Sequence, residues 1–215
     1  MIKDEIINRI LSSIILLPIV LFLIIKGSFL FNFFICTCFF ITTYEWLKLS
    51  KNNLLKFFGT IFIVISFYAV FKIRNEFDRD YFHLLLVVTI CVSTDIGGYL
   101  FGNIFNGPKL TKISPKKTYA GVIGSFLLSL ILANLFLNFS SDVQTFKLTK
   151  EMFSFILLIS FVSQIGDIAI SYFKRKSKIK DTGTIIPGHG GILDRIDGMI
   201  FAIPFSYVIF LNFNF

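Results

Sequence analysis

The sequence predicts an all-α, polytopic integral membrane protein of about seven transmembrane helices. Composition is the first reason, because 55% of the 215 residues are hydrophobic and only 16% are charged, whereas a soluble domain has about 25% charged residues. The mean hydropathy of +0.79 is the second. The third is that the net charge of +8 comes from a few polar loops between long apolar runs. These features exclude a disordered chain, a secreted disulfide scaffold and a nucleic-acid-binding domain.

The apolar runs give the expected spans in order. A helix needs about 20 mostly apolar residues to cross the hydrocarbon core. Lys3 and Arg9 precede the first run as in a signal peptide, but no small-residue cleavage site follows, so we expect this run to be retained. Pro18 and Pro204 are positioned to kink the first and last spans. The expected spans are 10–25, 28–47, 54–71, 82–104, 119–139, 152–171 and 199–214.

Lysine and arginine concentrate in alternate loops. The N-terminus and the loops after the second, fourth and sixth spans hold 15 of the 21 basic residues, and the other loops hold 6. Because cytoplasmic loops carry the excess of Lys and Arg, we expect the N-terminus and the loops 105–118 and 172–198 to be cytoplasmic. We expect residues 1–215 to form a single membrane domain, in which 1–80 supply N-terminal spans and 81–215 carry the functional loops.

Two aspartates lie inside expected spans, where an ionisable group is costly and indicates a functional site by default. They are Asp95, in the fourth span, and Asp167, about one heptad before Lys174. Both have glycine beside them, which permits close approach of another helix or of a ligand. The alternative is a carboxylate that is paired with a basic residue or hydrogen-bonded to a neighbouring helix. Glu45 is interpreted as an interfacial anchor.

The loop 105–118 ends in a run of lysines. Ser114 and Pro115 match the N-cap and first position of a helix, so we expect a helix to begin there. Lysines in a first turn oppose the helix dipole, and a bound anion would remove that conflict. Anchoring of the loop to lipid headgroups explains the charge equally well. The substrate-binding candidates in this loop are Ser114, Lys116, Lys117 and Thr118.

The stretch 171–198 is the densest in polar residues. Its glycines and proline prevent a regular helix, and Gly190 and Gly191 offer bare amides to phosphate oxygens. Asp194 and Asp197 are three residues apart, which places them on one face of the following helix. Together with Asp167 they suit a hard cation such as Mg²⁺. Headgroup binding and charge matching at a helix N-terminus are the alternatives, but the combination favours phosphate chemistry.

The same stretch resembles the signature of the phosphatidate cytidylyltransferases, also called CDP-diacylglycerol synthases. That signature has a Ser, Lys-Arg, Lys-Asp, Pro-Gly-His-Gly-Gly, Asp-Arg and a last Asp, and Ser171 to Asp197 fill every fixed position. Ser93 to Gly102, Ile113 to Gly124 and Gly166-Asp167 extend the resemblance to roughly the C-terminal two-thirds. The N-terminal third matches only at Tyr44-Glu45-Trp46. Ala120 stands where the family usually has Glu or Gln, and the chain is shorter than most bacterial members.

The resemblance implies a nucleotidyltransferase of phospholipid biosynthesis that makes CDP-diacylglycerol and pyrophosphate from CTP and phosphatidate. It implies a multi-pass protein of the bacterial inner membrane, with its active site at the cytoplasmic face. The implied partners are CTP, phosphatidate and membrane lipid, with a second copy of the chain in a homodimer and no nucleic acid. The implied cofactor is Mg²⁺, with K⁺ beside it.

The resemblance also suggests roles for individual residues. Asp167, Asp194 and Asp197 are the expected Mg²⁺ ligands, and Lys174, Arg175 and Lys180 are expected to bind phosphates, with Lys116 and Lys117 completing the clamp. His189 would donate a hydrogen bond to phosphate or protonate the leaving group, and Asp181 would position Lys180 or bind metal through water. Asp95 would line the pocket that admits the lipid headgroup. The catalytic candidates are Asp167, Lys174, Arg175, Lys180, Asp181, His189, Asp194, Arg195 and Asp197.

Two other functions are compatible with parts of this pattern. One is an enzyme that uses another lipid phosphate, such as an archaeal-type CDP-lipid synthase or a polyprenol kinase-like protein, since a motif that reads phosphates says little about lipid tails. The other is a small transporter or channel in which Asp95 and Asp167 bind ions. That function leaves the glycine-rich loop unexplained.

Overall fold

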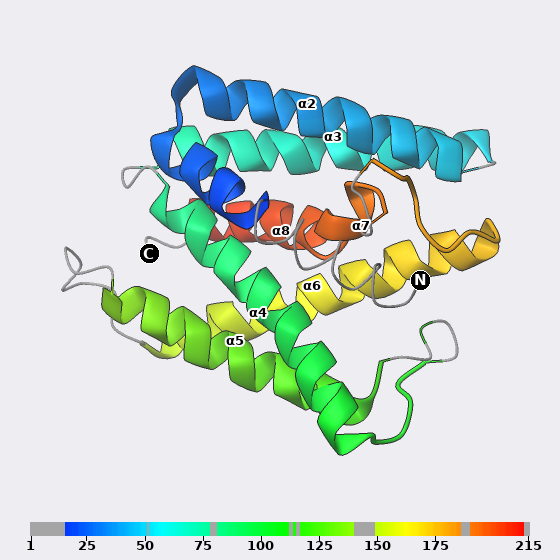
Figure 1. The fold of residues 1–215 in the computed structure, drawn as a ribbon. Helices are drawn as coiled ribbons and strands as arrows, with labels where there is room; N and C mark the ends of the chain where they lie inside the picture. The colour runs from blue at the N-terminus through cyan, green and yellow to red at the C-terminus, as the bar shows by residue number, and fades with distance from the viewer. Residues whose placement is uncertain are drawn as a thin grey trace. The chain divides into compact units, whose positions relative to one another are not determined.

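The computed structural model describes residues 16–50, 52–77, 81–111, 114, 117–139, 149–185 and 190–212. Every regular element within these ranges is a helix (Figure 1). Five helices are long and apolar enough to cross a membrane: α2 (Ser28–Leu49), α3 (Asn53–Asn75), α4 (Phe82–Phe105), α5 (Tyr119–Phe139) and α6 (Lys150–Lys176). This confirms the all-α class and shows a long apolar helix at each of the five central expected spans.

The first and last expected spans correspond to shorter apolar helices. They are Leu16–Lys26 and α8 (Met199–Asn212), and the beginning of the first expected span lies outside the described residues. The remaining helix, α7 (Leu193–Ile196), is a single turn. The chain divides into two compact units, Met1–Leu84 with Phe173–Asp197, and Leu85–Tyr172 with Gly198–Phe215. The glycine-rich stretch therefore belongs to the same unit as the N-terminal helices.

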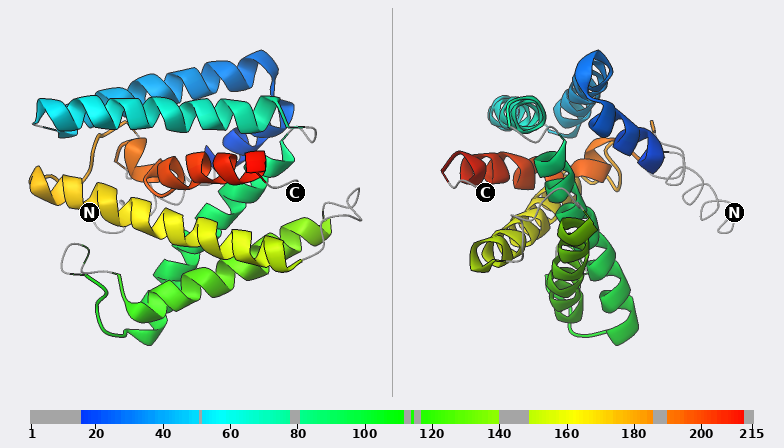
Figure 2. Two further views of the ribbon diagram at one scale, coloured as in Figure 1. Left: turned by 180° about the vertical axis from the view of Figure 1, so that it is seen from behind. Right: turned by 90° about the vertical axis from the view of Figure 1, so that its left-hand side faces the viewer.

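In the first unit, α2 and α3 lie side by side in every view (Figures 1 and 2). The turn between them is set by Asn52, whose side-chain oxygen accepts a hydrogen bond from the Leu54 N–H at 2.9 Å and caps α3. Phe39 of α2 and Phe67 of α3 meet edge to face, with ring centroids 5.6 Å apart. Large apolar side chains such as Phe57 and Phe58 stay exposed, as expected for a surface that contacts lipid.

A buried arginine closes the helix Leu16–Lys26. The guanidinium of Arg74, on α3, donates hydrogen bonds to the carbonyl oxygens of Ile24 at 2.6 Å and Ile25 at 3.1 Å. These carbonyls lie in the last turn of their helix, where no intrahelical donor exists. Arg74 thus satisfies backbone groups that would otherwise be costly in an apolar environment.

In the second unit, α4 and α5 approach closely through glycine (Figure 1). A Cβ atom on Gly97 would lie 2.5 Å from the carbonyl oxygen of Gly124, so only glycine permits this crossing. Ser125 of α5 donates to the Thr94 carbonyl oxygen at 2.7 Å, and the Thr94 hydroxyl donates to Ser160 of α6 at 2.8 Å. The glycine beside Asp95 therefore admits a neighbouring helix.

The predicted helix start at Ser114 and Pro115 is wrong. Helix α5 begins at Tyr119, and the Thr118 hydroxyl oxygen accepts the Gly121 N–H at 3.1 Å, which makes Thr118 the N-cap. Ser114 lies in a bend, and Pro115 falls outside the described residues. The reason is an antiparallel bridge between Lys109 and Thr118, which folds the segment back on itself before the helix can begin.

Candidate functional site

In the first unit, the Asp194 carboxylate gathers donors from both ends of the glycine-rich stretch. Its Oδ1 accepts the Lys174 ammonium at 2.8 Å. Its Oδ2 accepts the backbone N–H of Thr182 at 2.7 Å, the backbone N–H of Gly191 at 3.0 Å and the Thr182 hydroxyl at 3.0 Å. The pair is largely buried, with side-chain exposures of 12% for Lys174 and 5% for Asp194. Asp194 therefore ties α6, the loop and α7 together.

These contacts set the charge state of Asp194. Burial opposes ionisation of the carboxyl group, but the hydrogen bonds from Lys174, Gly191 and Thr182 outweigh it, so the pKa of Asp194 lies below its ordinary value. The group is therefore ionised at neutral pH. Lys174 has its positive charge held beside a fixed negative charge.

A second carboxylate, Glu45, lies on the other side of the same loop. Glu45 belongs to α2 and is only 1% exposed. It accepts the backbone N–H of Ile192 at 3.1 Å, the N–H of Leu193 at 2.8 Å and the Thr182 hydroxyl at 3.1 Å. The interpretation of Glu45 as an interfacial anchor is therefore wrong. It lies within an expected span, and that position was the available signal of an internal role.

Between them, the two carboxylates take the three consecutive backbone N–H groups of residues 191–193. The prediction that Gly191 offers a bare amide is therefore wrong, because that N–H already donates to Asp194. Gly190, with φ of +86°, has the left-handed conformation that favours glycine. The N–H groups of residues 191–193 are therefore not available to a bound anion in this structure.

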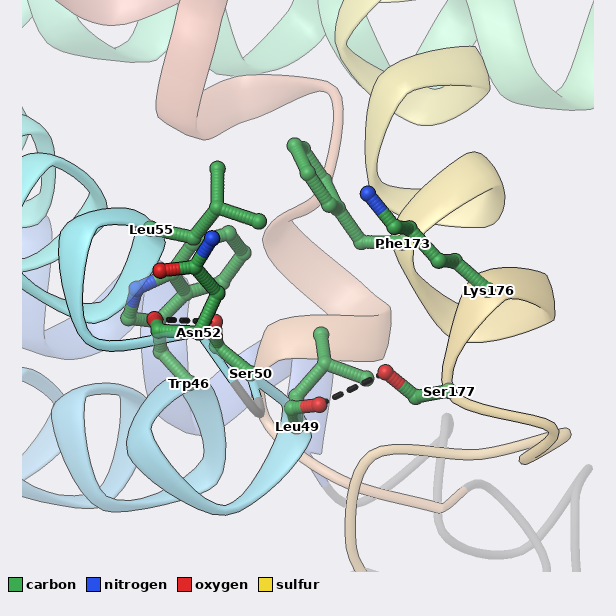
Figure 3. Close-up of a pocket in the computed structure, with 8 residues that line it drawn as sticks. All are labelled: Trp46, Leu49, Ser50, Asn52, Leu55, Phe173, Lys176 and Ser177. Atoms are coloured by element: carbon green, nitrogen blue, oxygen red, sulfur yellow. Dashed lines mark hydrogen bonds between the residues drawn. The ribbon is translucent and has the colours of Figure 1, made fainter.

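A small pocket lies between the C-terminal ends of α2 and α6 and the start of α3, next in the chain to Glu45 and Lys174. Figure 3 shows the rings of Trp46 and Phe173 on its walls, and their centroids lie 5.2 Å apart. The Ser177 hydroxyl donates to the Leu49 carbonyl oxygen at 2.7 Å and holds the ends of α6 and α2 together (Figure 3). At about 140 Å³ the pocket is smaller than the usual 300–1,000 Å³ of a ligand site. A whole nucleotide does not fit there.

In the second unit, the predicted phosphate ligand Lys117 and the predicted metal ligand Asp167 form an ion pair. The Lys117 Nζ atom lies 2.6 Å from Asp167 Oδ2, with side-chain exposures of 22% and 27%. Lys117 also donates to the Gln164 carbonyl oxygen at 3.3 Å, and Ser171 donates to Asp167 Oδ1 at 3.3 Å. The end of the loop 105–118 is thereby held at α6. The alternative reading of Asp167, a carboxylate paired with a basic residue, describes this arrangement.

The other candidates differ in exposure. Gly190, Ser114, Thr118 and Asp197 are half-buried, whereas His189 and Lys116 lie outside the described residues. Five charged candidates are exposed: Asp95, Arg175, Lys180, Asp181 and Arg195. The described part of the chain contains no group of three or more His, Cys, Asp or Glu side chains that could hold a metal ion.

Comparison with known proteins agrees with the resemblance in the signature. Residues 51–213 match the model of the cytidylyltransferase family. A protein of Rickettsia felis named phosphatidate cytidylyltransferase is 33% identical over 96% of this chain and 93% of its own length. Proteins of the same name from Haemophilus influenzae and Bacillus subtilis are 41% and 36% identical over 75% and 73% of this chain. The chain covers 59% and 57% of the lengths of those two relatives. This multi-pass membrane protein belongs to the cytidylyltransferase family.

Proposed function

We propose that this protein is a CTP:phosphatidate cytidylyltransferase. A phosphate oxygen of phosphatidate attacks the α-phosphorus of CTP, the bond to the β-phosphate breaks, and CDP-diacylglycerol and pyrophosphate are formed. The observation that carries this conclusion is the match to the Rickettsia felis phosphatidate cytidylyltransferase over nearly the full length of both chains. The complete signature from Ser171 to Asp197 supports it.

The chemistry requires charge neutralisation more than a base. The nucleophile is already an anion, so the main barrier is bringing two polyanions together in line. Positively charged side chains that are already oriented reduce that barrier. The proposed phosphate ligands are Lys174, Arg175 and Lys180 in the first unit and Lys117 in the second. Lys174 is oriented by Asp194, and Lys117 by Asp167.

Family membership implies a divalent metal, and we propose Mg²⁺. Asp194 fits it poorly, because its oxygens already accept the Lys174 ammonium and the backbone N–H groups of Thr182 and Gly191, and the Thr182 hydroxyl lies 3.0 Å away. Asp167 fits better, since it is partly exposed and its contacts within the described residues are one ammonium group, of Lys117, and one hydroxyl group, of Ser171. Mg²⁺ is commonly held by one or two carboxylates together with substrate phosphates rather than by a protein cage. When bound, it would neutralise phosphate charge.

The remaining assignments stay proposals. His189 would act on the leaving group, Asp181 and Asp197 would assist metal or phosphate binding, and Asp95 would line the entry for the lipid headgroup. Ser114, Thr118 and Gly190 would contact substrate. A K⁺ ion beside Mg²⁺ and a homodimer are likewise proposed, and so is the bacterial inner membrane as location.

We also propose that the basic loops face the cytoplasm. The distribution of Lys and Arg supports this orientation. Lys178→Cys and Thr118→Cys, in a background without the natural cysteines, are expected to react with a membrane-impermeant reagent only from the cytoplasmic side. Reaction only from the outside would contradict the orientation.

The activity is tested with purified protein in detergent, labelled CTP and phosphatidate. We expect labelled CDP-diacylglycerol and pyrophosphate in equal amounts, and no product after chelation of Mg²⁺. Parallel reactions with an archaeal-type ether lipid phosphate and with polyprenol identify the lipid class. No product from phosphatidate, with product from another lipid, would refute the proposed substrate.

A further inference from the structure

We infer that Glu45 is a positioning residue of this enzyme, which fixes the glycine-rich stretch so that Lys174 is presented to substrate phosphates. The inference rests on the proposed function, and it adds a residue from the N-terminal third of the chain to the machinery. Glu45 touches neither the phosphate ligands nor, in our proposal, the substrates. It acts through Thr182 and residues 192–194.

The contacts of Glu45 are long-range and specific. One carboxylate oxygen accepts the Ile192 N–H at 3.1 Å, and the other accepts the Leu193 N–H at 2.8 Å and the Thr182 hydroxyl at 3.1 Å. Thr182 stands at one end of the loop and Ile192 at the other. A single side chain of α2 therefore closes the loop at both ends.

The glycines of the loop are shaped around this carboxylate. A Cβ atom on Gly183 would lie 2.5 Å from Glu45 Oε1, and one on Gly191 would lie 2.5 Å from Glu45 Oε2. Contacts this short do not occur, so any larger residue at either position would displace Glu45 or the loop. Gly191 of the signature and Gly183, which lies between its fixed positions, thus leave space for a residue that lies outside it.

Glu45 is connected to Lys174 by a short chain of hydrogen bonds. The Thr182 hydroxyl lies 3.1 Å from Glu45 Oε2 and 3.0 Å from Asp194 Oδ2, and a hydroxyl has one proton to donate. Asp194 in turn holds the Lys174 ammonium at 2.8 Å. Loosening Glu45 would therefore free the Thr182 hydroxyl and the N–H groups of Ile192 and Leu193, the two residues that precede Asp194.

Stability alone is a poor reason for a carboxylate at this position. A buried charge contributes less to stability than a well-packed apolar residue of similar size, because it must first lose its hydration. Its value lies in selecting one conformation of the groups that it binds. At Glu45 the selected conformation is that of the segment carrying Asp194, which is why we assign it a role in positioning.

The variant Glu45→Gln tests this role with steady-state kinetics. The amide keeps the size of the side chain, but its NH₂ group faces a backbone N–H that needs an acceptor. If the functional loop conformation is then populated in a fraction of molecules, the apparent affinity for CTP falls by that fraction. We expect the KM for CTP to rise about tenfold, as for one buried donor left unsatisfied, while kcat at saturating CTP changes by less than about twofold.

Thr42→Val is the matched control. Thr42 lies nearly one turn earlier on α2, is fully buried, and its hydroxyl has no hydrogen-bond partner among the described residues. We expect wild-type KM and kcat from this variant. A Glu45→Gln enzyme with unchanged KM and a lower kcat would have lost folded protein only, and that result would overturn the inference.

A second measurement does not depend on turnover. Hydrogen exchange in the substrate-free, detergent-solubilised protein is expected to be faster at the amides of Ile192 and Leu193 in Glu45→Gln, and unchanged in Thr42→Val. If the wild type makes no CDP-diacylglycerol from phosphatidate, the proposed function fails by itself. The exchange rates then decide whether Glu45 fixes the loop, and equal rates in wild type and Glu45→Gln would refute it.

Discussion

Replacing Asp194 by Asn should uncouple Lys174 from the glycine-rich stretch. The amide oxygen can take the place of Oδ2 and keep its contacts with Thr182 and Gly191. The NH₂ group then takes the place of Oδ1, which accepted the Lys174 ammonium at 2.8 Å, so that two donors face each other. A hydrogen bond to a charged group is worth about 1.5–3 kcal/mol, and breaking a buried pair costs about 3–5 kcal/mol. Because Lys174 is still 12% exposed, we expect Asp194→Asn to lower the free energy of unfolding by about 3 kcal/mol, at the lower end of that range.

The measurement is a double-mutant cycle with Asp194→Asn, Lys174→Met and the combined variant, followed by unfolding in detergent micelles. The combined variant removes the stranded ammonium as well as the carboxylate, so we expect a coupling free energy of about 2 kcal/mol. Asp194→Asn is also expected to abolish CTP-dependent product formation while leaving membrane insertion intact. Additive effects, with coupling below about 0.5 kcal/mol, would refute the structural role of the pair. An active Asp194→Asn enzyme would refute both the orienting role and the sequence-based metal assignment.

Three further predictions concern the same groups. Gly191→Ala is expected to lower the free energy of unfolding by about 1–3 kcal/mol in the same assay and to remove activity, because its Cβ would collide with Glu45. Gly107→Ala is the control and should be neutral, because its Cβ would lie 3.6 Å from Ala120 Cβ. Lys117→Met should lower kcat/KM about tenfold through loss of one charged phosphate contact, while Lys150→Met, at the start of α6, should not. Because the pKa of Asp194 is lowered, its stabilising contribution is complete above the unfolded value near 3.8 and is lost as the pH falls through the lower folded value. Limited proteolysis should therefore show faster cleavage near Thr182 and Gly191 below pH 3.8 in the wild type, and Asp194→Asn should lack this acid step.

Local sequence patterns predicted most of the fold. Hydropathy located α2 to α6 within a few residues, because the length and composition of a membrane helix are local properties. The start of α5 was misplaced because two capping sequences compete, and the pairing of Lys109 with Thr118 decides between them. That pairing joins residues nine positions apart, whereas a capping pattern depends only on a few consecutive residues.

The candidate site was predicted in part. The signature contains both Asp194 and Lys174, but their pairing depends on how α6 and α7 meet. Glu45 was assigned the wrong role because its partners are 137 to 148 residues away in the chain. A carboxylate inside an apolar helix was visible in the sequence. The backbone N–H groups that it binds carry no residue identity and leave no pattern.

The carboxylates also change how the positive charge of the protein is understood. Backbone amides of a glycine-rich loop are a common site for phosphate, yet the amides of residues 191–193 are already occupied by Asp194 and Glu45. The proposed phosphate ligands are therefore side chains, and the exposed Arg175 and Lys180 lie in the same stretch. Gly183 and Gly191 then serve to fit the loop around the acidic residues, and in our proposal the basic residues bind the substrates. This division accounts for acidic, basic and glycine residues in one short segment better than a phosphate-binding loop does.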